Sequence, residues 1–396
     1  MAANTHLEHL EDDILNNGTA GGKNAIAFLR ELGQMLTEPN STIRITTKWD
    51  GAPAIVCGQH PSTGNFFVGT KSVFNKGAPK ICFSNSDIDE WYNGELAHKL
   101  KTCLKLLPQL GIKGVLQGDL LYTNDLGSKT INGEKCVSFT PNTITYAVPD
   151  KSPLAMKIKA SQMGIVFHTT YSGGPAVRDM SASFGANVSK MQGNKNVTVF
   201  SSDFSDATGS SLFSSNEKAR YLAAVNKTEG SLKQASKFLD ILNGKQDGRF
   251  LFSALFKQYF NSFIRGGKKI QNVQVVAMGF TKFYTDLLDK EIATKKQEGT
   301  KKKYQQIKTE GLKFLKVNYR AIYMTVASYM NLIAAKNMVI RQLEKVKGIG
   351  TYIKTDTGFK VTAPEGFVAI KSGSALKLVD RLEFSRVNFN IEKNWG

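Results

Sequence analysis

The 396-residue sequence predicts an α+β fold, in which antiparallel strands form a body that a large helical segment interrupts. Short apolar runs separated by Gly, Pro, Asn and Ser fill residues 43–84 and 114–171 and resume after residue 350, which is typical of strands joined by turns. Between them, residues 215–347 carry apolar side chains at three- and four-residue steps, the period of amphipathic helices. With 41% hydrophobic residues, the chain can bury substantial cores.

Two more helical segments are expected near the N-terminus. Apolar residues recur at helical spacing through residues 6–37, where Asn16, Asn17 and Gly18 interrupt the pattern. Residues 86–110 show the same spacing and are expected to form a helix between two groups of strands.

The large helical segment has its own expected boundaries. Residues 181–216 are rich in Ser, Gly, Asn and Asp and are expected to be a surface connection. Ser231 is an expected N-cap, and Gly244 and Gly348 stand where helices should end. The last helix is expected to be long and to cover residues 302–347.

These patterns divide the chain into three expected parts. N-terminal helices occupy residues 1–40, and a strand-rich body combines residues 41–185 with residues 350–396. A basic helical insertion occupies residues 205–348.

The charge of the chain indicates a polyanionic partner. The sequence holds 52 Lys and Arg against 33 Asp and Glu, a formal net charge of +19. Residues 251–320 alone hold 15 basic residues against five acidic ones. Phosphates are attracted to such a surface and release counterions when they bind to it. The alternative is a basic chain whose charge serves only solubility.

Cysteine usage and hydropathy exclude several classes of protein. The four cysteines form no CxxC, and the five histidines show no metal-ligand spacing, so neither a zinc site nor a disulfide scaffold is expected. The N-terminus is acidic and polar, unlike a signal peptide, and no apolar run approaches the length of a membrane span. We expect a cytoplasmic protein with no membrane partner, and we favour a monomer.

The segment Lys48-Trp49-Asp50-Gly51 is the centre of the functional prediction. It resembles the KxDG motif of the covalent nucleotidyltransferase superfamily, which comprises ATP-dependent DNA ligases, RNA ligases and mRNA-capping enzymes. In that family the lysine attacks the α-phosphate of a nucleoside triphosphate and holds the nucleotide through a phosphoamide bond. A lysine amine suits this chemistry when neighbouring cations or burial disfavour its ammonium form. The resemblance makes Lys48 the catalytic residue and puts Asp50 and Gly51 beside the nucleotide.

Further residues resemble the remaining motifs of this superfamily in the family's order. Their implied roles are a basic nucleotide contact, a ribose or metal carboxylate, a base-stacking aromatic, a second metal carboxylate and an α-phosphate cation. In that order they are Lys71, Asp119 in LQGDLLY, Tyr146 in NTITYAVP, Glu365 in PEGFV, and Lys377, for which Lys371 is a rival.

Each of these residues also has an ordinary interpretation. Lys71 and Lys377 could be surface lysines, Asp119 a carboxylate at a strand end, and Tyr146 a core aromatic. Glu365 could begin a turn before a strand. The order of the residues along the chain is what favours the shared interpretation.

The sequence also departs from the family pattern. Pro53 stands where many members carry Arg or Asn, and Met163 precedes GIVF where a second EG motif would need glutamate. The helical segment separates motifs that are usually close. The resemblance therefore implies an antiparallel-sheet nucleotidyltransferase body, ATP-grasp-like in class, with a helical insertion and without the OB-fold domain of DNA ligases.

The resemblance implies an ATP-dependent polynucleotide ligase that works through a lysyl-AMP intermediate. Mg²⁺ or Mn²⁺ would be held by Asp119 and Glu365, and the partner would be 5′-phosphate and 3′-hydroxyl ends of RNA or DNA, with a slight preference for RNA. We expect the insertion to bind the nucleic-acid backbone. The lysines expected to do so are Lys295, Lys296, Lys301, Lys302, Lys303 and Lys308. Alternatives are a GTP-dependent capping guanylyltransferase and a non-catalytic nucleic-acid-binding module.

Overall fold

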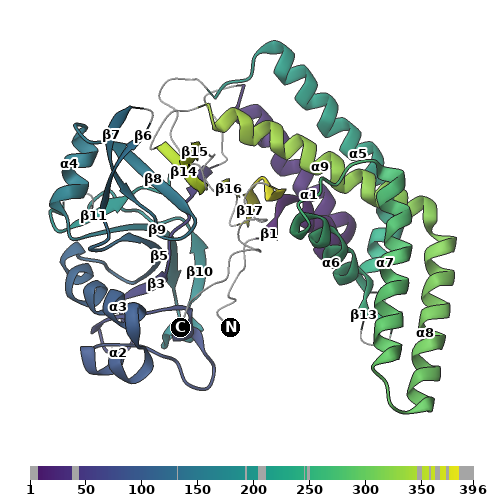
Figure 1. The fold of residues 1–396 in the computed structure, drawn as a ribbon, viewed down its shortest axis with the longest axis horizontal. Coiled ribbons are helices and arrows are strands. Elements are labelled where there is room, and N and C mark those ends of the chain that lie inside the picture. Colours follow the sequence, from purple (N-terminus) through teal and green to yellow (C-terminus); the bar gives the residue numbers. More distant parts are fainter. Residues whose placement is uncertain are drawn as a thin grey trace.

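The computed structural model describes the backbone of residues 8–37, 44–131, 133–191, 194–203, 211–244, 246–247, 250–345, 350–355, 358–361, 366–371 and 374–382. Within these ranges, the side chains of residue 44, of residues 243–250 and 350–361, and of residues 371 and 374 are not described. A sheet-rich part and a helical part lie side by side in Figure 1.

Two sheets build the sheet-rich part. The six-stranded sheet has the order β10-β9-β5-β3-β4, with β11 added in parallel to β9. Its strands are β3 (Ala54–Gln59), β4 (Phe66–Gly69), β5 (Val115–Tyr122), β9 (Met163–Ser172), β10 (Ser181–Phe184) and β11 (Val197–Phe200). The five-stranded sheet has the order β15-β14-β8-β7-β6 and is antiparallel throughout. Its strands are β6 (Gly127–Ile131), β7 (Glu134–Phe139), β8 (Ile144–Pro149), β14 (Gly350–Thr355) and β15 (Gly358–Val361).

A third sheet joins the beginning of the chain to its end. It has the order β1-β17-β16-β2, with strands β1 (Glu8–His9), β2 (Arg44–Lys48), β16 (Gly366–Lys371) and β17 (Ser374–Leu378). Side chains alternate between the two faces of a strand. One face of this sheet packs into the hydrophobic core of the helical part through Ile45, Phe367, Ala369, Leu376 and Leu378.

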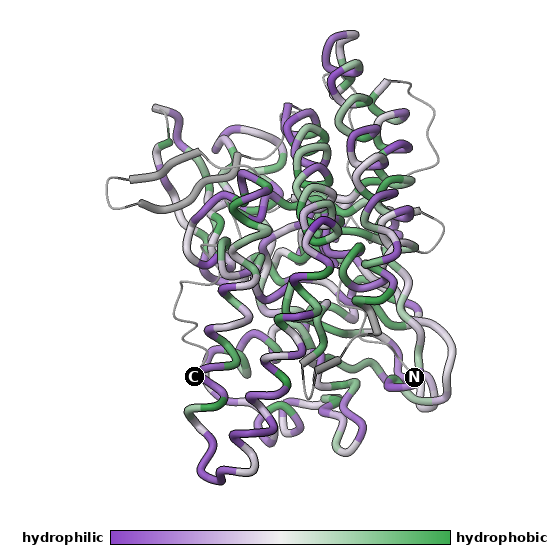
Figure 2. Tube along the Cα trace, turned by 90° about the vertical axis from the view of Figure 1, so that its right-hand side faces the viewer, coloured by the Kyte–Doolittle hydropathy of each residue, from purple (hydrophilic) through white to green (hydrophobic). Residues whose placement is uncertain are grey.

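Helices cover the sheets and form the second part. α2 (Asn85–Trp91), α3 (Gly94–Leu106) and α4 (Pro153–Ala160) belong to the sheet-rich part. So do the 3₁₀ helices η2 (Lys71–Phe74), η3 (Leu107–Leu110) and η4 (Val177–Asp179), whereas η1 (Leu10–Asp12) packs in the helical part. The helical part holds α1 (Asp13–Met35), α5 (Ser215–Gly244), α6 (Phe252–Arg265), α7 (Val273–Ala293), α8 (Glu298–Val317) and α9 (Tyr319–Leu343), with the short hairpin β12 (Gln246–Asp247) and β13 (Phe250–Leu251). Hydrophobic and hydrophilic residues alternate along these helices, as expected for amphipathic helices around a shared core (Figure 2). Among the described residues, no helix combines the length and apolarity that a membrane crossing requires.

The α+β class and the antiparallel pairing predicted from the sequence are confirmed. The break expected near Asn16–Gly18 is present, because Gly18 has a non-helical φ of 59° inside α1. α1 shares one hydrophobic core with α5, α6 and α9, so the N-terminal helix belongs to the helical part rather than to a part of its own. The glycines of α1 permit this packing: a Cβ on Gly33 would lie 2.5 Å from the ring of Tyr221.

Several predicted elements need correction. Ser231 lies inside α5, where its hydroxyl donates to the carbonyl of Thr228, so it is not an N-cap. The long helix expected over residues 302–347 is divided at Asn318, whose side chain donates to the carbonyl of Phe314. The segment around Cys82 makes only an isolated bridge to Val68 and forms no strand. Strands β10 and β11 lie within the expected surface connection, α4 and β6 were not predicted, and Gly348 lies outside the described residues.

A buried group of charges holds η1 to the helical part. Lys336 of α9 donates to both carboxylate oxygens of Glu11 at 2.7 and 2.8 Å, and both side chains are at most 1% exposed. Arg381 donates to Asp12 at 3.1 Å, and Tyr329 donates to the same carboxylate at 2.8 Å. Buried charges of this kind are tolerated only when they are paired and hydrogen-bonded.

Replacing Lys336 by methionine tests the importance of this buried group. The Lys336→Met variant leaves the carboxylate of Glu11 buried without its main partner, so we expect the free energy of unfolding to fall by about 3–5 kcal/mol. Lys345→Met is the control, because Lys345 pairs with Glu217 on the surface and its loss should leave the free energy of unfolding almost unchanged. Urea denaturation measures both, and equal effects of the two substitutions would contradict the structure.

Candidate active site

Lys48 lies at the point where the N-terminal and C-terminal segments meet. It is the last residue of β2, and its backbone is paired with that of Gly366 at the start of β16. Gly366 has a φ of 143°, a conformation that favours glycine. A Cβ at this position would lie 2.5 Å from the carbonyl oxygen of Leu378. Both the positive φ and the close carbonyl of Leu378 therefore require glycine at this position of the predicted EG motif, beside Lys48.

The register of this sheet puts Lys48 and Lys377 on one face. Val368 is paired with Thr46 on one side and with Lys377 on the other. Side chains of paired residues share a face, and so do residues two positions apart, so Lys48, Thr46, Val368 and Lys377 all project to the side away from the helical core. Lys371 ends β16 at the far end from Lys48 and is out of phase with it. The register thus favours Lys377 over Lys371 as the motif lysine.

Asp50 positions the lysine loop through the turn before β8. Its carboxylate is buried and accepts hydrogen bonds from the side chain of Asn142 at 2.7 Å and from the backbone of Thr143 and Ile144 at 2.7 and 2.8 Å. These three hydrogen bonds satisfy the carboxylate oxygens of Asp50 within the protein. In this structure Asp50 positions the lysine loop, and its contact with a nucleotide stays a prediction.

Tyr146 completes the same connection. The backbone N–H of Asp50 donates to the Tyr146 hydroxyl at 2.7 Å. The Tyr146 ring is 2% exposed and lies 5.3 Å from the ring of Phe139 and 5.0 Å from that of Trp49. Both observations favour the interpretation as a core aromatic, and stacking of this ring on a base stays a prediction.

Gly51 brings the lysine loop against Asp119. A Cβ on Gly51 would lie 2.5 Å from the Cβ of Asp119 and 3.1 Å from the carbonyl oxygen of Leu120. The next residues bind the same strand, since the N–H of Ala52 donates to the carbonyl of Leu120 at 2.9 Å and the N–H of Leu120 donates to that of Pro53 at 3.1 Å. The KxDG segment and the predicted acid motif are therefore in direct contact.

Asp119 has a neighbour that the sequence analysis did not identify. Nε2 of His168 lies 3.5 Å from an oxygen of Asp119, and both side chains are partly exposed. His168 occupies a β-bulge, where the pairing of β5 with β9 shifts between Gln117 and Gly118. Bulges often redirect a side chain next to a functional site. The imidazole and the carboxylate form a pair of possible ligands at one end of the six-stranded sheet.

Of the two remaining predicted residues, the structure describes Lys71 but not Glu365. Lys71 is exposed and is the first residue of η2. It follows the pair Val56–Gly69 by two residues, so it lies at the end of the sheet where Ala54 pairs with Asp119. Glu365 lies outside the described residues. The structure thus brings Lys48, Gly51, Asp119 and Lys377 together through backbone pairs and close packing.

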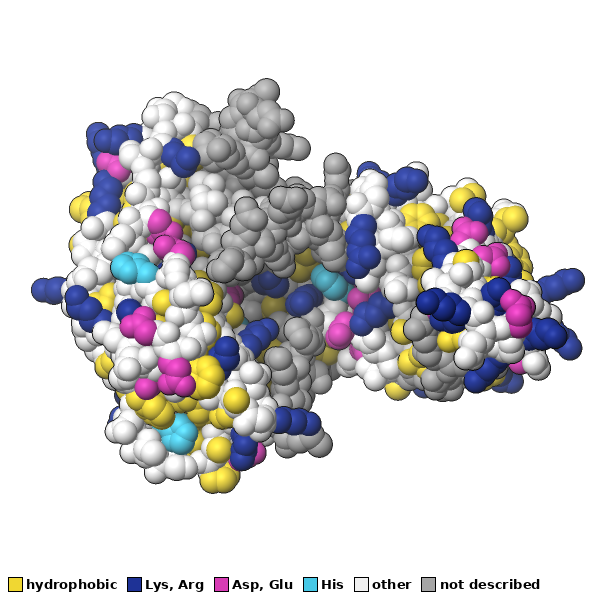
Figure 3. Space-filling model, turned by 60° about the horizontal axis from the view of Figure 1, so that its bottom comes forward, with side chains coloured by type: hydrophobic (Ala, Val, Ile, Leu, Met, Phe, Trp, Pro, Cys, Tyr) yellow, Lys and Arg dark blue, Asp and Glu magenta, His cyan; other side chains and the backbone are white. Residues whose placement is uncertain are grey.

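Positive charge gathers on this face of the sheet. His9 is the partner of Lys377 in the parallel pair β1–β17. Burial lowers the pKa of His9 well below its ordinary value, and the charges of Arg381, Lys336, Lys377 and Lys48 lower it further. Figure 3 shows Lys and Arg side chains and a histidine in a hollow between the sheet-rich and helical parts. Anions are attracted to a concave surface with this potential.

The predicted nucleic-acid lysines fall into two groups. α7 and α8 run side by side and extend away from the sheets in Figure 1. Lys295, Lys301 and Lys308 are engaged in ion pairs with Glu291, Glu298 and Asp289 at 2.6 to 2.9 Å. Lys296, Lys302 and Lys303 are exposed and form no ion pair with any described residue. Only the second group presents its charge fully to solvent.

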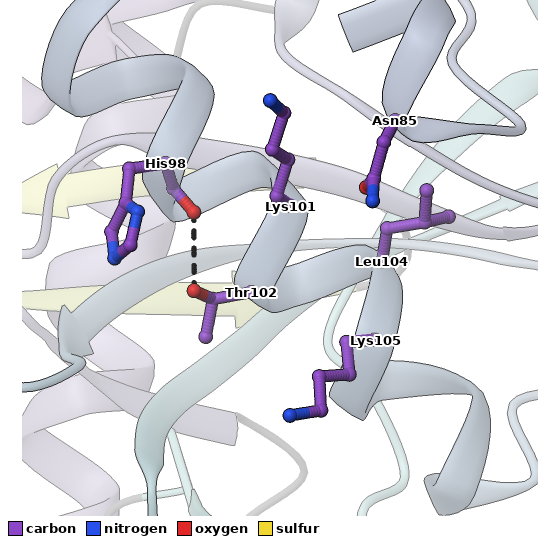
Figure 4. A pocket seen from close by; sticks show the side chains of 6 residues that line it. All are labelled: Asn85, His98, Lys101, Thr102, Leu104 and Lys105. Atoms are coloured by element: carbon purple, nitrogen blue, oxygen red, sulfur yellow. Dashed lines mark hydrogen bonds between the residues drawn. The ribbon is translucent and has the colours of Figure 1, made fainter.

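An open depression on α3 is separate from this site. It is lined by Asn85, His98, Lys101, Thr102, Leu104 and Lys105, and Thr102 donates to the carbonyl of His98 within the helix (Figure 4). Lys101 is paired with Asp89 at 2.6 Å. None of the residues that resemble the nucleotidyltransferase motifs lines it.

Replacing Gly51 by alanine tests the contact between the lysine loop and β5. The added Cβ would overlap Asp119, so we expect Gly51→Ala to lower the free energy of unfolding by about 1–3 kcal/mol. Gly77→Ala is the control, because a Cβ there has no atom within 4 Å. If thermal or urea unfolding shows the same small change for both variants, the close approach is absent in solution.

Comparison with known proteins adds a family without a known activity. No curated protein and no solved structure matches the sequence. The model of one family matches residues 4–393, and its description reads "Family of unknown function (DUF6267)".

Proposed function

The chain belongs to the DUF6267 family, described as of unknown function, and we propose that it is an ATP-dependent polynucleotide ligase that works through a lysyl-AMP intermediate at Lys48. The observation that carries the proposal is the sheet β1-β17-β16-β2. It places the lysine of KxDG beside the glycine of EG and on the same face as Lys377. These segments, which resemble motifs of one chemistry, share a small area of one sheet, although residue 48 precedes residues 366 and 377 by more than 300 residues.

The first step would attach the nucleotide to the protein. The amine nitrogen of Lys48 attacks the α-phosphorus of ATP, and a nitrogen–phosphorus bond forms. The bond between the α-phosphorus and the bridging oxygen breaks, pyrophosphate leaves with the electron pair, and the amine loses its extra proton to solvent. Lys377, on the same face, would stabilise the negative charge that develops on the phosphate oxygens.

A divalent cation fits the carboxylate at Asp119. Mg²⁺ is usually bound by one or two carboxylates together with substrate phosphates and water, so the partly exposed Asp119 suits it. Glu365, the second carboxylate that the resemblance implies, lies outside the described residues. The ion would supply charge neutralisation to the triphosphate. His168 lies close enough to Asp119 to orient the carboxylate.

Two further transfers would complete the reaction. An oxygen of a 5′-phosphate attacks the α-phosphorus, the nitrogen–phosphorus bond breaks, and Lys48 recovers its amine. A 3′-hydroxyl then attacks the activated 5′-phosphate, AMP leaves, and a phosphodiester bond forms with loss of one proton. The rigid positions of Asp50 and Gly51 hold the lysine loop in place for both transfers.

The arm formed by α7 and α8 would bind the nucleic-acid backbone. α8 holds 20 residues and is therefore about 30 Å long. Its exposed lysines can contact phosphates with little rearrangement, whereas the paired lysines would first have to give up carboxylate partners.

Loss of the lysine amine tests the proposed chemistry. Protein incubated with α-labelled ATP and Mg²⁺ should retain the label on a denaturing gel, and Lys48→Ala should abolish it because no nitrogen remains to attack the phosphorus. Lys76→Ala removes an exposed lysine outside the motifs and should label normally.

The same assay separates the alternatives. Labelling from GTP in place of ATP would favour a capping guanylyltransferase. A wild-type protein that binds nucleic acid but takes label from no nucleotide would be a binding module. Undiminished labelling of Lys48→Ala would refute the assignment of the nucleophile.

Salt dependence tests the role of the α8 lysines. Replacing both Lys302 and Lys303 by alanine should weaken nucleic-acid binding at low salt and should reduce the slope of log affinity against log salt by about 0.7–0.9 per lysine. The charge-matched control is Lys233→Ala with Lys237→Ala on α5, where both residues are also exposed. Fluorescence anisotropy with a labelled oligonucleotide measures both, and equal slopes for the two double variants would argue against a specific role of α8.

A further inference from the structure

The N-terminal strand adds an unassigned side chain to the phosphate-facing sheet. β1 pairs in parallel with β17, and His9 is in register with Lys377. Paired residues share a face, so His9 lies on the same face as Lys377 and Lys48. No motif of the sequence analysis included His9, and the function proposed above assigns no role to it.

The backbone around His9 is fixed from two sides. β1 is held by its pairing with β17. Glu11 and Asp12, in the 3₁₀ helix that follows directly, are held by Lys336, Arg381 and Tyr329. Such support is what a side chain needs if it is to meet a ligand without reorganising.

The chemistry of the His9 ring suits an anion. Its Nδ1 atom is buried and has no hydrogen-bond partner within the described part of the chain, while the residue as a whole is of intermediate exposure. The tautomer that carries its proton on Nε2 avoids a buried unpaired donor and presents an N–H on the other side of the ring. The charges of Arg381, Lys336, Lys377 and Lys48 all lower the pKa of this ring. Lys336 and Arg381 are paired with Glu11 and Asp12, so Lys377 and Lys48 are the cations of the sheet that act on it.

The position of His9 selects one part of the nucleotide. Neighbouring strands are about 4.8 Å apart, so β17 lies about 10 Å and β1 about 14 Å from β2 along the sheet. In phosphoryl transfer the attacking and leaving atoms lie roughly in line with the phosphorus. β2 is an edge strand of this sheet, so a pyrophosphate that leaves across the sheet from Lys48 passes over β16 and β17 and reaches β1.

We propose that His9, one strand beyond the α-phosphate cation Lys377, forms the subsite that binds the β- and γ-phosphates of the nucleotide and the pyrophosphate released from it. This inference rests on the proposed function, since it takes Lys48 as the attacking residue. The N-terminal strand thus supplies the pyrophosphate contact, and inorganic pyrophosphate should bind to the unreacted protein.

Titration calorimetry with inorganic pyrophosphate tests the subsite directly. His9→Leu removes the ring nitrogens, and pyrophosphate should bind to it about tenfold or more weakly, the effect of losing one hydrogen bond to a charged group. His9→Gln keeps an amide N–H near the position of Nε2 and should bind within a few-fold of wild type. His98→Leu, at a position on α3 far from this sheet in sequence and fold, is the control and should bind as wild type. AMP should bind equally to all four proteins.

A measurement on the wild-type protein avoids dependence on the folding of any variant. Bound pyrophosphate brings negative charge to His9, so the pKa of its imidazole, followed by nuclear magnetic resonance, should rise when pyrophosphate is added, while that of His98 should not change. An imidazole of His9 that does not respond to saturating pyrophosphate would overturn the proposal. So would equal pyrophosphate affinity of His9→Leu and wild type.

Failure of the subsite and failure of the proposed function are distinguishable. If the wild-type protein takes label from α-labelled ATP but His9→Leu binds pyrophosphate as wild type does, the ligase proposal stands and the subsite proposal fails. If pyrophosphate binding depends on His9 but the wild-type protein takes no label, the subsite stands as an anion site and the ligase proposal fails.

Discussion

The pairing of β2 with β16, and through β16 with β17, is the constraint on which the candidate site depends. It joins residue 48 to residues 366–378 by a continuous ladder of backbone hydrogen bonds. One face of this sheet is anchored in the helical core by Phe367, Leu376 and Leu378. A slip of one residue in β2 would exchange its faces and move Lys48 toward that core. The hydrophobic face thus fixes the register, and the register fixes which lysines face the hollow.

Two further sets of contacts make the loop after β2 rigid. The carboxylate of Asp50 accepts three hydrogen bonds from residues 142–144, and the absence of a Cβ at Gly51 lets the loop lie against Asp119. The buried ion pairs behind β1 do the same for the N-terminal strand. A nucleophile gains effective concentration when its neighbours cannot move away.

The sequence predicted the class of fold, the strands that carry Lys48, Asp119 and Lys377, and the order in which these residues occur. It could not predict the roles of Asp50 and Tyr146, because their partners lie more than 90 residues away and depend on tertiary packing. His168 was missed because its effect arises from a β-bulge, and His9 because the pattern of its neighbours is helical. The break at Asn318 was missed because apolar residues continue at helical spacing on both sides of it, although the backbone turns there.

The identity of the modified residue tests the central claim most directly. The full chain would be incubated with each of the four nucleoside triphosphates and Mg²⁺, digested, and analysed by mass spectrometry for a peptide that carries one nucleoside monophosphate. The account predicts that this mass appears on Lys48 alone, with ATP as the donor. A monophosphate on Lys71 or Lys377 instead, or on no peptide with any of the four nucleotides, would contradict it.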